Sequence, residues 1–106
     1  METQNDSYEL IYSNVYIKHI DKHKKSGQKQ VLKKILSLLI DIKTDPYIGI
    51  GKPEELKYYG ERVVYSREIT KKHRLVYEIF EEEKIVDILS AYGHYNEKKK
   101  DEKTLF

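Results

Sequence analysis

The sequence predicts an α+β domain in which two N-terminal helices pack on one face of a mainly antiparallel β-sheet. Two observations lead to this fold class. The first half of the chain has two segments with helical periodicity, and the second half has three consecutive strand-like segments separated by short polar turns. A length of 106 residues also suits one compact domain and is too short for two domains with separate hydrophobic cores.

A short strand and a helix begin the domain. Residues 8–12, with the sequence YELIY, are rich in strand-forming side chains. Ser13 is a suitable N-cap for a helix over residues 15–25, in which the apolar residues form one narrow stripe among charged ones. The Ser26-Gly27 pair is expected to end this helix.

The second helix is the strongest local signal in the sequence. Between Gln28 and Lys43, apolar residues recur at spacings of three and four while lysines occupy the other side, which is typical of a helix facing a core. Asp45 and Pro46 end it, because a residue before proline disfavours helical backbone. The apolar positions are Val31, Leu32, Ile35, Leu36, Leu38, Leu39 and Ile42.

A loop and three strands complete the domain. Gly49, Gly51 and Pro53 predict an irregular loop rather than a helix or strand. The segments that follow alternate in polarity and are separated by two polar turns, which predicts two hairpins. The strands are expected at residues 62–69, 74–80 and 85–92.

The composition excludes several classes of protein. With no cysteine, the chain can form neither disulfides nor thiolate metal sites. No apolar run approaches membrane-spanning length and residues 1–7 do not resemble a secretory signal, so we expect a cytoplasmic protein with no membrane partner. A formal net charge of +2 does not by itself indicate nucleic-acid binding. We expect the domain to cover residues 8–95, with residues 96–106 as a charged, mobile tail.

Three side chains of the second half suit the cleavage of RNA. RNA carries its own nucleophile, the 2′-hydroxyl, so a ribonuclease needs only a base, an acid and positive charge around the transition state. Glu54 lies in a loop shaped by glycine and proline, Arg74 on an arm of a predicted hairpin, and His94 after the last strand. From the residues alone this grouping is only suggestive, because a glutamate in a polar loop is usually solvated surface.

Three segments resemble one known family. Residues 51–57 (GKPEELK), residues 65–77 (YSREITKKHRLVY) and the pair His94-Tyr95 are similar, in sequence and in spacing, to the YoeB/Txe toxins of the RelE superfamily. The resemblance extends from about residue 8 to residue 95. It implies the RelE-like, or microbial ribonuclease-like, fold and a type II toxin-antitoxin toxin that cleaves messenger RNA in the ribosomal A site.

The resemblance also implies a role for individual residues. Glu54 matches the general base, Arg74 the arginine that stabilises the transition state, and His94 the general acid, with neither metal nor cofactor. Expected partners are messenger RNA, the ribosome and an antitoxin of the YefM/Axe type, and by resemblance alone a homodimer. The positions that match RNA-binding residues are Lys52, Lys57, Arg67 and Tyr95.

Two features depart from the family pattern. The chain continues for eleven residues beyond Tyr95, whereas family members commonly end near the His-Tyr pair. A free terminal carboxylate therefore cannot contribute beside the acid. Glu68 follows Arg67 where relatives can carry a second arginine, so RNA binding is expected to depend more on the lysines.

Other interpretations of the sequence remain open. A toxin on this scaffold could poison a protein such as DNA gyrase without cutting RNA, or a catalytically inactive module could bind RNA or an antitoxin. His19 and His23 have the spacing of a helical metal pair, but no third ligand is evident and solvent-facing histidines are the plainer interpretation. His73 either contacts RNA or hydrogen-bonds the hairpin backbone. A basic helical region, which could contact ribosomal RNA or merely solvate the helices, comprises Lys18, Lys22, Lys24, Lys25, Lys29, Lys33 and Lys34.

Overall fold

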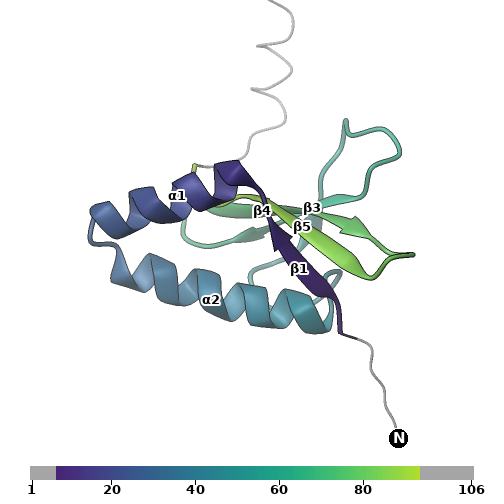
Figure 1. Ribbon diagram of the computed structural model, residues 1–106, viewed down its shortest axis with the longest axis horizontal. Coiled ribbons are helices and arrows are strands. Elements are labelled where there is room, and N and C mark those ends of the chain that lie inside the picture. Colours follow the sequence, from purple (N-terminus) through teal and green to yellow (C-terminus); the bar gives the residue numbers. More distant parts are fainter. Residues whose placement is uncertain (1–6, 94–106) are drawn as a thin grey trace, which may run out of the picture.

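The structure, a computed structural model, describes residues 7–93. These residues form two helices beside a single mixed sheet (Figure 1). The elements are β1 (Glu9–Tyr12), α1 (Asn14–Lys25), α2 (Lys29–Thr44), β2 (Glu54–Glu55), β3 (Val64–Glu68), β4 (Arg74–Phe80) and β5 (Ile85–Ser90). The prediction of an α+β domain with two N-terminal helices is confirmed. None of the helices in the described range is long and apolar enough to cross a membrane.

The strand order of the sheet is β1-β5-β4-β3-β2. β1 pairs with β5 in parallel, and the other neighbouring strands pair in antiparallel fashion. The predicted mainly antiparallel sheet is therefore correct. The first strand lies beside the last one because the two helices carry the chain away from the sheet and return it at the opposite edge.

Ser13 caps α1, as the sequence predicts. Its hydroxyl oxygen accepts a hydrogen bond from the Tyr16 N–H at 3.1 Å and donates one to the Leu89 carbonyl at 2.8 Å. The first contact satisfies a helical N–H that would otherwise lack a partner, and the second fastens the start of the helix to the end of β5. At the other end, Gly27 adopts a φ of +67°, a backbone conformation that favours glycine.

α2 buries a narrower stripe than its apolar pattern indicates. Burying each large aliphatic side chain of such a stripe contributes about 1.5–3 kcal/mol. Leu36, which the pattern placed in the core, is instead 59% exposed, because the sheet covers only one side of the helix. The α2 residues buried in the main core are Val31, Ile35, Leu38 and Ile42.

Residues of β3 and β4 alternate between the two faces of the sheet. On the face covered by the helices, Tyr77 joins the main core, and Arg67 contacts α2 through Asp41. The opposite face has no helix among residues 7–93. It carries a smaller apolar cluster of Leu56, Val64 and Val76, with Tyr59 and Leu89 packed against it.

Several predicted boundaries differ from the structure. The loop was expected to contain no regular structure, but Glu54–Glu55 pairs with Ser66 and Tyr65 to form β2. The predicted strand ends at residues 62 and 92 were also too generous, since β3 begins at residue 64 and β5 ends at residue 90. The expected tail, residues 96–106, lies outside the described residues.

Candidate active site

Glu54 and Arg74 lie together on the helix-free face of the sheet. Glu54 begins the edge strand β2, and Arg74 begins β4, with β3 between the two strands. Arg74 Nη2 is 3.7 Å from Glu54 Oε1. Two of the three predicted catalytic side chains therefore come from separate segments to one place.

The guanidinium of Arg74 is oriented by Ser66 at one nitrogen, while another of its nitrogens has no acceptor in the described part of the chain. Its Nε donates to Ser66 Oγ at 2.9 Å, which fixes the plane of the group. Its Nη2 is buried and has no hydrogen-bond partner among residues 7–93. Because a buried N–H usually has an acceptor, this atom is suited to an incoming anionic oxygen such as that of a phosphate.

Ser66 was missed by the sequence interpretation. It precedes Arg67 in β3 and faces the same side of the sheet as Arg74, two residues along the strand from Glu68, which is the residue opposite Arg74. Diagonal neighbours across antiparallel strands can touch through long side chains. The register of the hairpin could have identified Ser66 as a neighbour of Arg74, but the length of the turn alone did not fix that register.

His94 and Tyr95 lie outside the described residues. The last described residue, Gly93, is covalently bonded to His94, and its carbonyl accepts a hydrogen bond from the Arg74 N–H at 2.9 Å. The chain is thus hydrogen-bonded to the backbone of Arg74 immediately before the predicted general acid.

Lys52 and Lys57 flank Glu54 on the surface. The side chain of Lys52 is 86% exposed, and its Nζ lies 3.8 Å from a carboxylate oxygen of Glu68. Lys52 has a φ of +53°, which is uncommon for a residue with a side chain and reflects the tight bend before Pro53. Lys57 is also exposed. Both lysines remain predicted RNA contacts, and Glu68 offsets the charge of the first.

Arg67 is not on the surface, which corrects its interpretation as an RNA-binding residue. Alternation along β3 directs it toward the helices, and its side chain is fully buried there. Its Nε donates to the Tyr77 hydroxyl at 2.9 Å, and Nη1 pairs with the Asp41 carboxylate. The remaining guanidinium N–H groups donate to the carbonyls of Asp45, Ile48 and Ile50.

The buried arginine fixes the loop that leads to Glu54. Burial alone would raise the pKa of Asp41, but the hydrogen bonds from Arg67 and from the Ile50 N–H hold that pKa below its ordinary value. The loop passes so close that a Cβ at Gly49 would lie 1.8 Å from an Asp41 oxygen. Arg67 therefore serves the site indirectly, by shaping the backbone that carries Lys52 and Glu54.

The histidines of α1 hydrogen-bond the backbone of Ala91, contrary to the plainer interpretation that both face solvent, although His19 is only partly buried. His23 is 1% exposed, and its Nε2 donates to the Ala91 carbonyl at 2.9 Å. The Ala91 N–H donates to Nδ1 of His19 at 3.0 Å. His73 does bond the backbone, but at Gly93, whose N–H donates to its Nδ1 at 2.9 Å. Within the described range, no group of three or more His, Asp or Glu residues is arranged to hold a metal ion.

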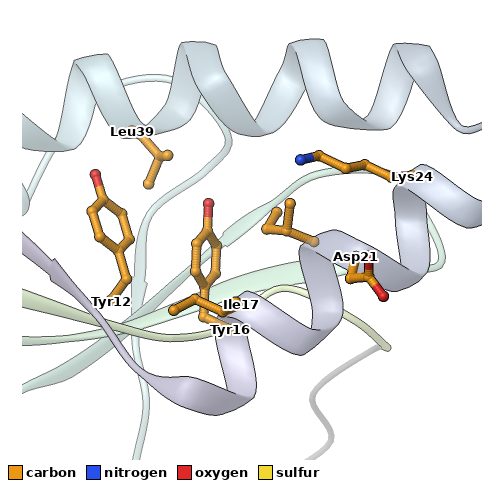
Figure 2. A pocket seen from close by; sticks show the side chains of 7 residues that line it. Tyr12, Tyr16, Ile17, Asp21, Lys24 and Leu39 are labelled. Atoms are coloured by element: carbon orange, nitrogen blue, oxygen red, sulfur yellow. The ribbon is translucent and has the colours of Figure 1, made fainter.

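A separate groove lies between the two helices and the end of β1. Figure 2 shows the rings of Tyr12 and Tyr16 side by side at one end, with Asp21 and Lys24 toward the other. The groove has a volume of about 460 Å³ and neither Glu54 nor Arg74 lines it. Its lining residues are Tyr12, Tyr16, Ile17, Ile20, Asp21, Lys24 and Leu39.

Comparison with known proteins identifies the family of this chain. Residues 15–95 match the family model described as the YoeB-like toxin of bacterial type II toxin-antitoxin systems. A toxin YoeB from Streptomyces coelicolor is 40% identical over 74 residues, which are 69% of this chain and 83% of the relative. The YoeB dimer structure from Staphylococcus aureus matches with a TM-score of 0.72 and 32% identity, covering 84% of this chain and 99% of the other.

A second structure from Staphylococcus aureus, the heterotetrameric YoeB-YefM toxin-antitoxin complex, matches with a TM-score of 0.68 and 33% identity, covering 83% of this chain and 98% of the other. The family match spans most of the chain and includes Glu54, Arg74 and His94. The chain therefore belongs to the YoeB-like toxins of bacterial type II toxin-antitoxin systems.

Proposed function

We propose that this toxin is a ribosome-dependent endoribonuclease that cleaves messenger RNA in the A site. The observation that carries the proposal is the pairing of the Glu54 carboxylate with Arg74, whose buried Nη2 has no hydrogen-bond partner among residues 7–93. A base beside an anion-binding donor is the combination that cleavage through the 2′-hydroxyl needs. A toxin acting only by binding a protein would not need this pair on one open face.

The proposed reaction is an in-line transesterification. Glu54 takes the proton of the 2′-hydroxyl while O2′ forms a bond to phosphorus, and the bond from phosphorus to the 5′-oxygen breaks. Arg74 donates to the nonbridging oxygens, whose negative charge grows in the transition state. His94 supplies a proton to the departing 5′-oxygen. The products are a 2′,3′-cyclic phosphate and a 5′-hydroxyl, and no metal or cofactor takes part.

RNA would be held around this pair by side chains on its flanks. Lys52 and Lys57 border Glu54 and would contact phosphates of the messenger, and Tyr95 keeps its proposed role in positioning RNA. The lysines of α1 and α2 are mostly exposed and would contact ribosomal RNA through its phosphates. Arg67 has no part in this contact because it is buried.

The proposed inhibitor is an antitoxin of the YefM/Axe type. The support is the family, together with a Staphylococcus aureus structure that contains YoeB and YefM. An acidic segment that folds on binding could pair with Lys52 and Arg74 and so occupy the place of the RNA. A homodimer, as in another Staphylococcus aureus structure, and action in the cytoplasm belong to the same proposal.

The deciding experiment is end-group mapping of messenger RNA on programmed ribosomes, with and without a metal chelator. Glu54→Gln and His94→Gln are each expected to slow cleavage by about 100- to 10,000-fold while ribosome binding is retained. Glu55→Gln is the matched control, because that carboxylate is the exposed neighbour of Glu54 in β2. Wild-type growth arrest without any cut message, or full cleavage by Glu54→Gln, would contradict the proposal.

A further inference from the structure

We propose that His19, His23 and His73 form a proton-sensitive clamp on the backbone of residues 91–93, and thereby position the residue that follows, His94. The inference rests on the proposed catalytic role of His94. The histidines are positioning residues rather than catalytic ones, since their contacts are to backbone. Two of them come from α1, and the third comes from the turn between β3 and β4.

The clamp binds polar backbone groups just after β5 ends. Ala91 is held at both its N–H, by His19 at 3.0 Å, and its carbonyl, by His23 at 2.9 Å. The Gly93 N–H is held by His73 at 2.9 Å, and the Gly93 carbonyl accepts from the Arg74 N–H at 2.9 Å. Residues 91–93 are therefore held by three histidine side chains together with one backbone bond from Arg74.

Two of these bonds require neutral imidazole. A peptide N–H can only donate, so Nδ1 of His19 and Nδ1 of His73 must each present a lone pair to it. A protonated imidazole carries a hydrogen on both nitrogens and has no lone pair to offer. Protonating either ring therefore breaks its hydrogen bond, because the new N–H of the imidazole then points at the peptide N–H. The His23 bond differs, because its Nε2 donates to a carbonyl and survives protonation.

The surroundings also disfavour protonation. The largest cause is burial, which lowers the pKa of both His19 and His73 below the ordinary value of 6.5. Neighbouring lysines and histidines add to it, since a proton on any of them would repel a proton on the ring: Lys22 and His23 lie near His19, while His23, Lys72, His19 and Lys22 lie near His73. At neutral pH both rings are therefore neutral, and their hydrogen bonds to the Ala91 and Gly93 N–H groups are intact.

The ring of Tyr92 joins these side chains into one packed cluster. Its centroid lies 5.7 Å from His19, 5.0 Å from His23 and 4.6 Å from His73. Lys22 Nζ sits 4.0 Å from the centre of the same ring. Loss of one contact is expected to loosen its neighbours, because the rings pack against each other as well as against the backbone.

The test uses amide hydrogen exchange by NMR on the full chain carrying His94→Gln, so that His94 itself does not titrate. Between pH 7.5 and a pH well below 6.5, protection of the Ala91 and Gly93 amides is expected to fall by about tenfold beyond the intrinsic change, the scale of one lost hydrogen bond. The Ile88 amide, inside β5, is the internal reference. Unchanged protection at both amides would overturn the inference.

Two substitutions of His73 distinguish the loss of its hydrogen-bond acceptor from the effect of its protonation. In His73→Asn, the side-chain oxygen can take the place of Nδ1 but does not titrate, so Gly93 should stay protected at both pH values. In His73→Leu, the acceptor is lost and protection should be low at both. If the Gly93 amide of His73→Asn loses protection in acid as the wild type does, the clamp is refuted, even if the Leu variant fails to fold.

Activity gives a separate readout with His94 intact. His73→Leu should lower the single-turnover cleavage rate on ribosomes by about tenfold or more without weakening ribosome binding, and His73→Asn should restore it. If the wild type cuts no RNA, the proposed function fails while the exchange data still decide the clamp. If the wild type cuts and His73→Leu cuts equally fast, the positioning role fails alone.

Discussion

Two arginines of one hairpin, Arg67 and Arg74, point to opposite faces of the sheet and have opposite uses. Arg67 is surrounded by acceptors on the helix side, so its charge is compensated and serves the fold. Arg74 faces the open side, where Ser66 orients it and Nη2 is left without an acceptor in the described part of the chain. Strand alternation alone decides which arginine can reach a ligand.

Substitution of the two arginines should therefore give opposite results. Arg67→Leu should lower the free energy of unfolding by about 3–5 kcal/mol, because it leaves Asp41 and the loop carbonyls without their partner. Arg74→Leu should change that free energy by less than about 1 kcal/mol and yet abolish cleavage. Urea unfolding followed by circular dichroism measures the first quantity. Equal losses of stability in the two variants would contradict this division.

Glu68 should weaken RNA binding. It lies 3.8 Å from Lys52, the exposed lysine beside the site. Glu68→Gln removes this anion and Glu68→Arg replaces it by a cation, so affinity for ribosomes should rise by roughly 2- to 10-fold, more for the arginine and less at high salt. Filter binding at two salt concentrations checks this. Glu82→Gln, in the turn before β5, is the control and should leave affinity unchanged.

For individual residues, the family motif predicted which side chains belong to the site but not which face of the sheet each one takes. The resemblance placed Glu54 and Arg74 in one site, and the structure brings them to 3.7 Å. It also assigned Arg67 to RNA, because a motif does not record which face a strand residue takes. The contact of Ser66 was missed because it depends on the register of the β3–β4 hairpin, and that of His23 because its partner, Ala91, lies far along the chain.

Among the elements, α1 depends on one hydroxyl group. Ser13 caps the helix and also bonds the carbonyl of Leu89, so Ser13→Ala should lower the free energy of unfolding by about 1–2 kcal/mol. Ser37→Ala is the matched control, because that exposed hydroxyl bonds only its own helix, at the Lys33 carbonyl. Its effect should stay within about 0.5 kcal/mol. Thermal or urea unfolding of both variants measures the difference.

The helices were predictable from sequence and the edge strand was not. The helix ends are determined by neighbouring residues in the sequence: Ser13 precedes α1, and the Asp45-Pro46 pair follows α2. β2 has only two residues, and nothing in their composition distinguishes them from the loop before them. They become a strand because β3 offers Tyr65 and Ser66 as partners, which is a tertiary effect.

For the whole molecule, acid should act in two separate ranges of pH. The neutral rings of His19 and His73 contribute stability that is full above 6.5 and is lost as the pH falls through their lowered pKa values. Glu81, which accepts from Lys84, Tyr47 and Tyr8, has a pKa lowered from 4.5 to about 2. Its contribution is complete above 4.5 and is lost as the pH falls toward 2.

The two ranges can be separated by substitution. Glu81→Gln should reduce the loss of stability below pH 4.5, where the lowered pKa of Asp41 still contributes, and leave the loss below 6.5 in place. The combined change of His19 and His73 to Asn should remove the loss that begins below 6.5 and leave the loss below 4.5 in place. Chemical denaturation at a series of pH values measures both. A single transition that neither variant alters would show that other groups govern acid unfolding.

Global composition was a poor guide at this scale. A net charge of +2 and the absence of cysteine are compatible with many small domains, so the class of partner came from the motif and not from charge. The fold class followed from the order of helical and strand patterns, which is a property of the whole chain. The parallel pairing of β1 with β5 remained outside reach, because no turn joins the two strands.

That pairing has a consequence for biosynthesis. Of the described strands, β1 is translated first, while β5, the strand beside it, is translated last. Until β5 emerges, β1 has no neighbour in the described sheet, Ala91 has not reached the histidines of α1, and Ser13 lacks the carbonyl of Leu89. A nascent chain therefore cannot complete the fold of this domain until β5 has emerged, however early β1 and the two helices are made.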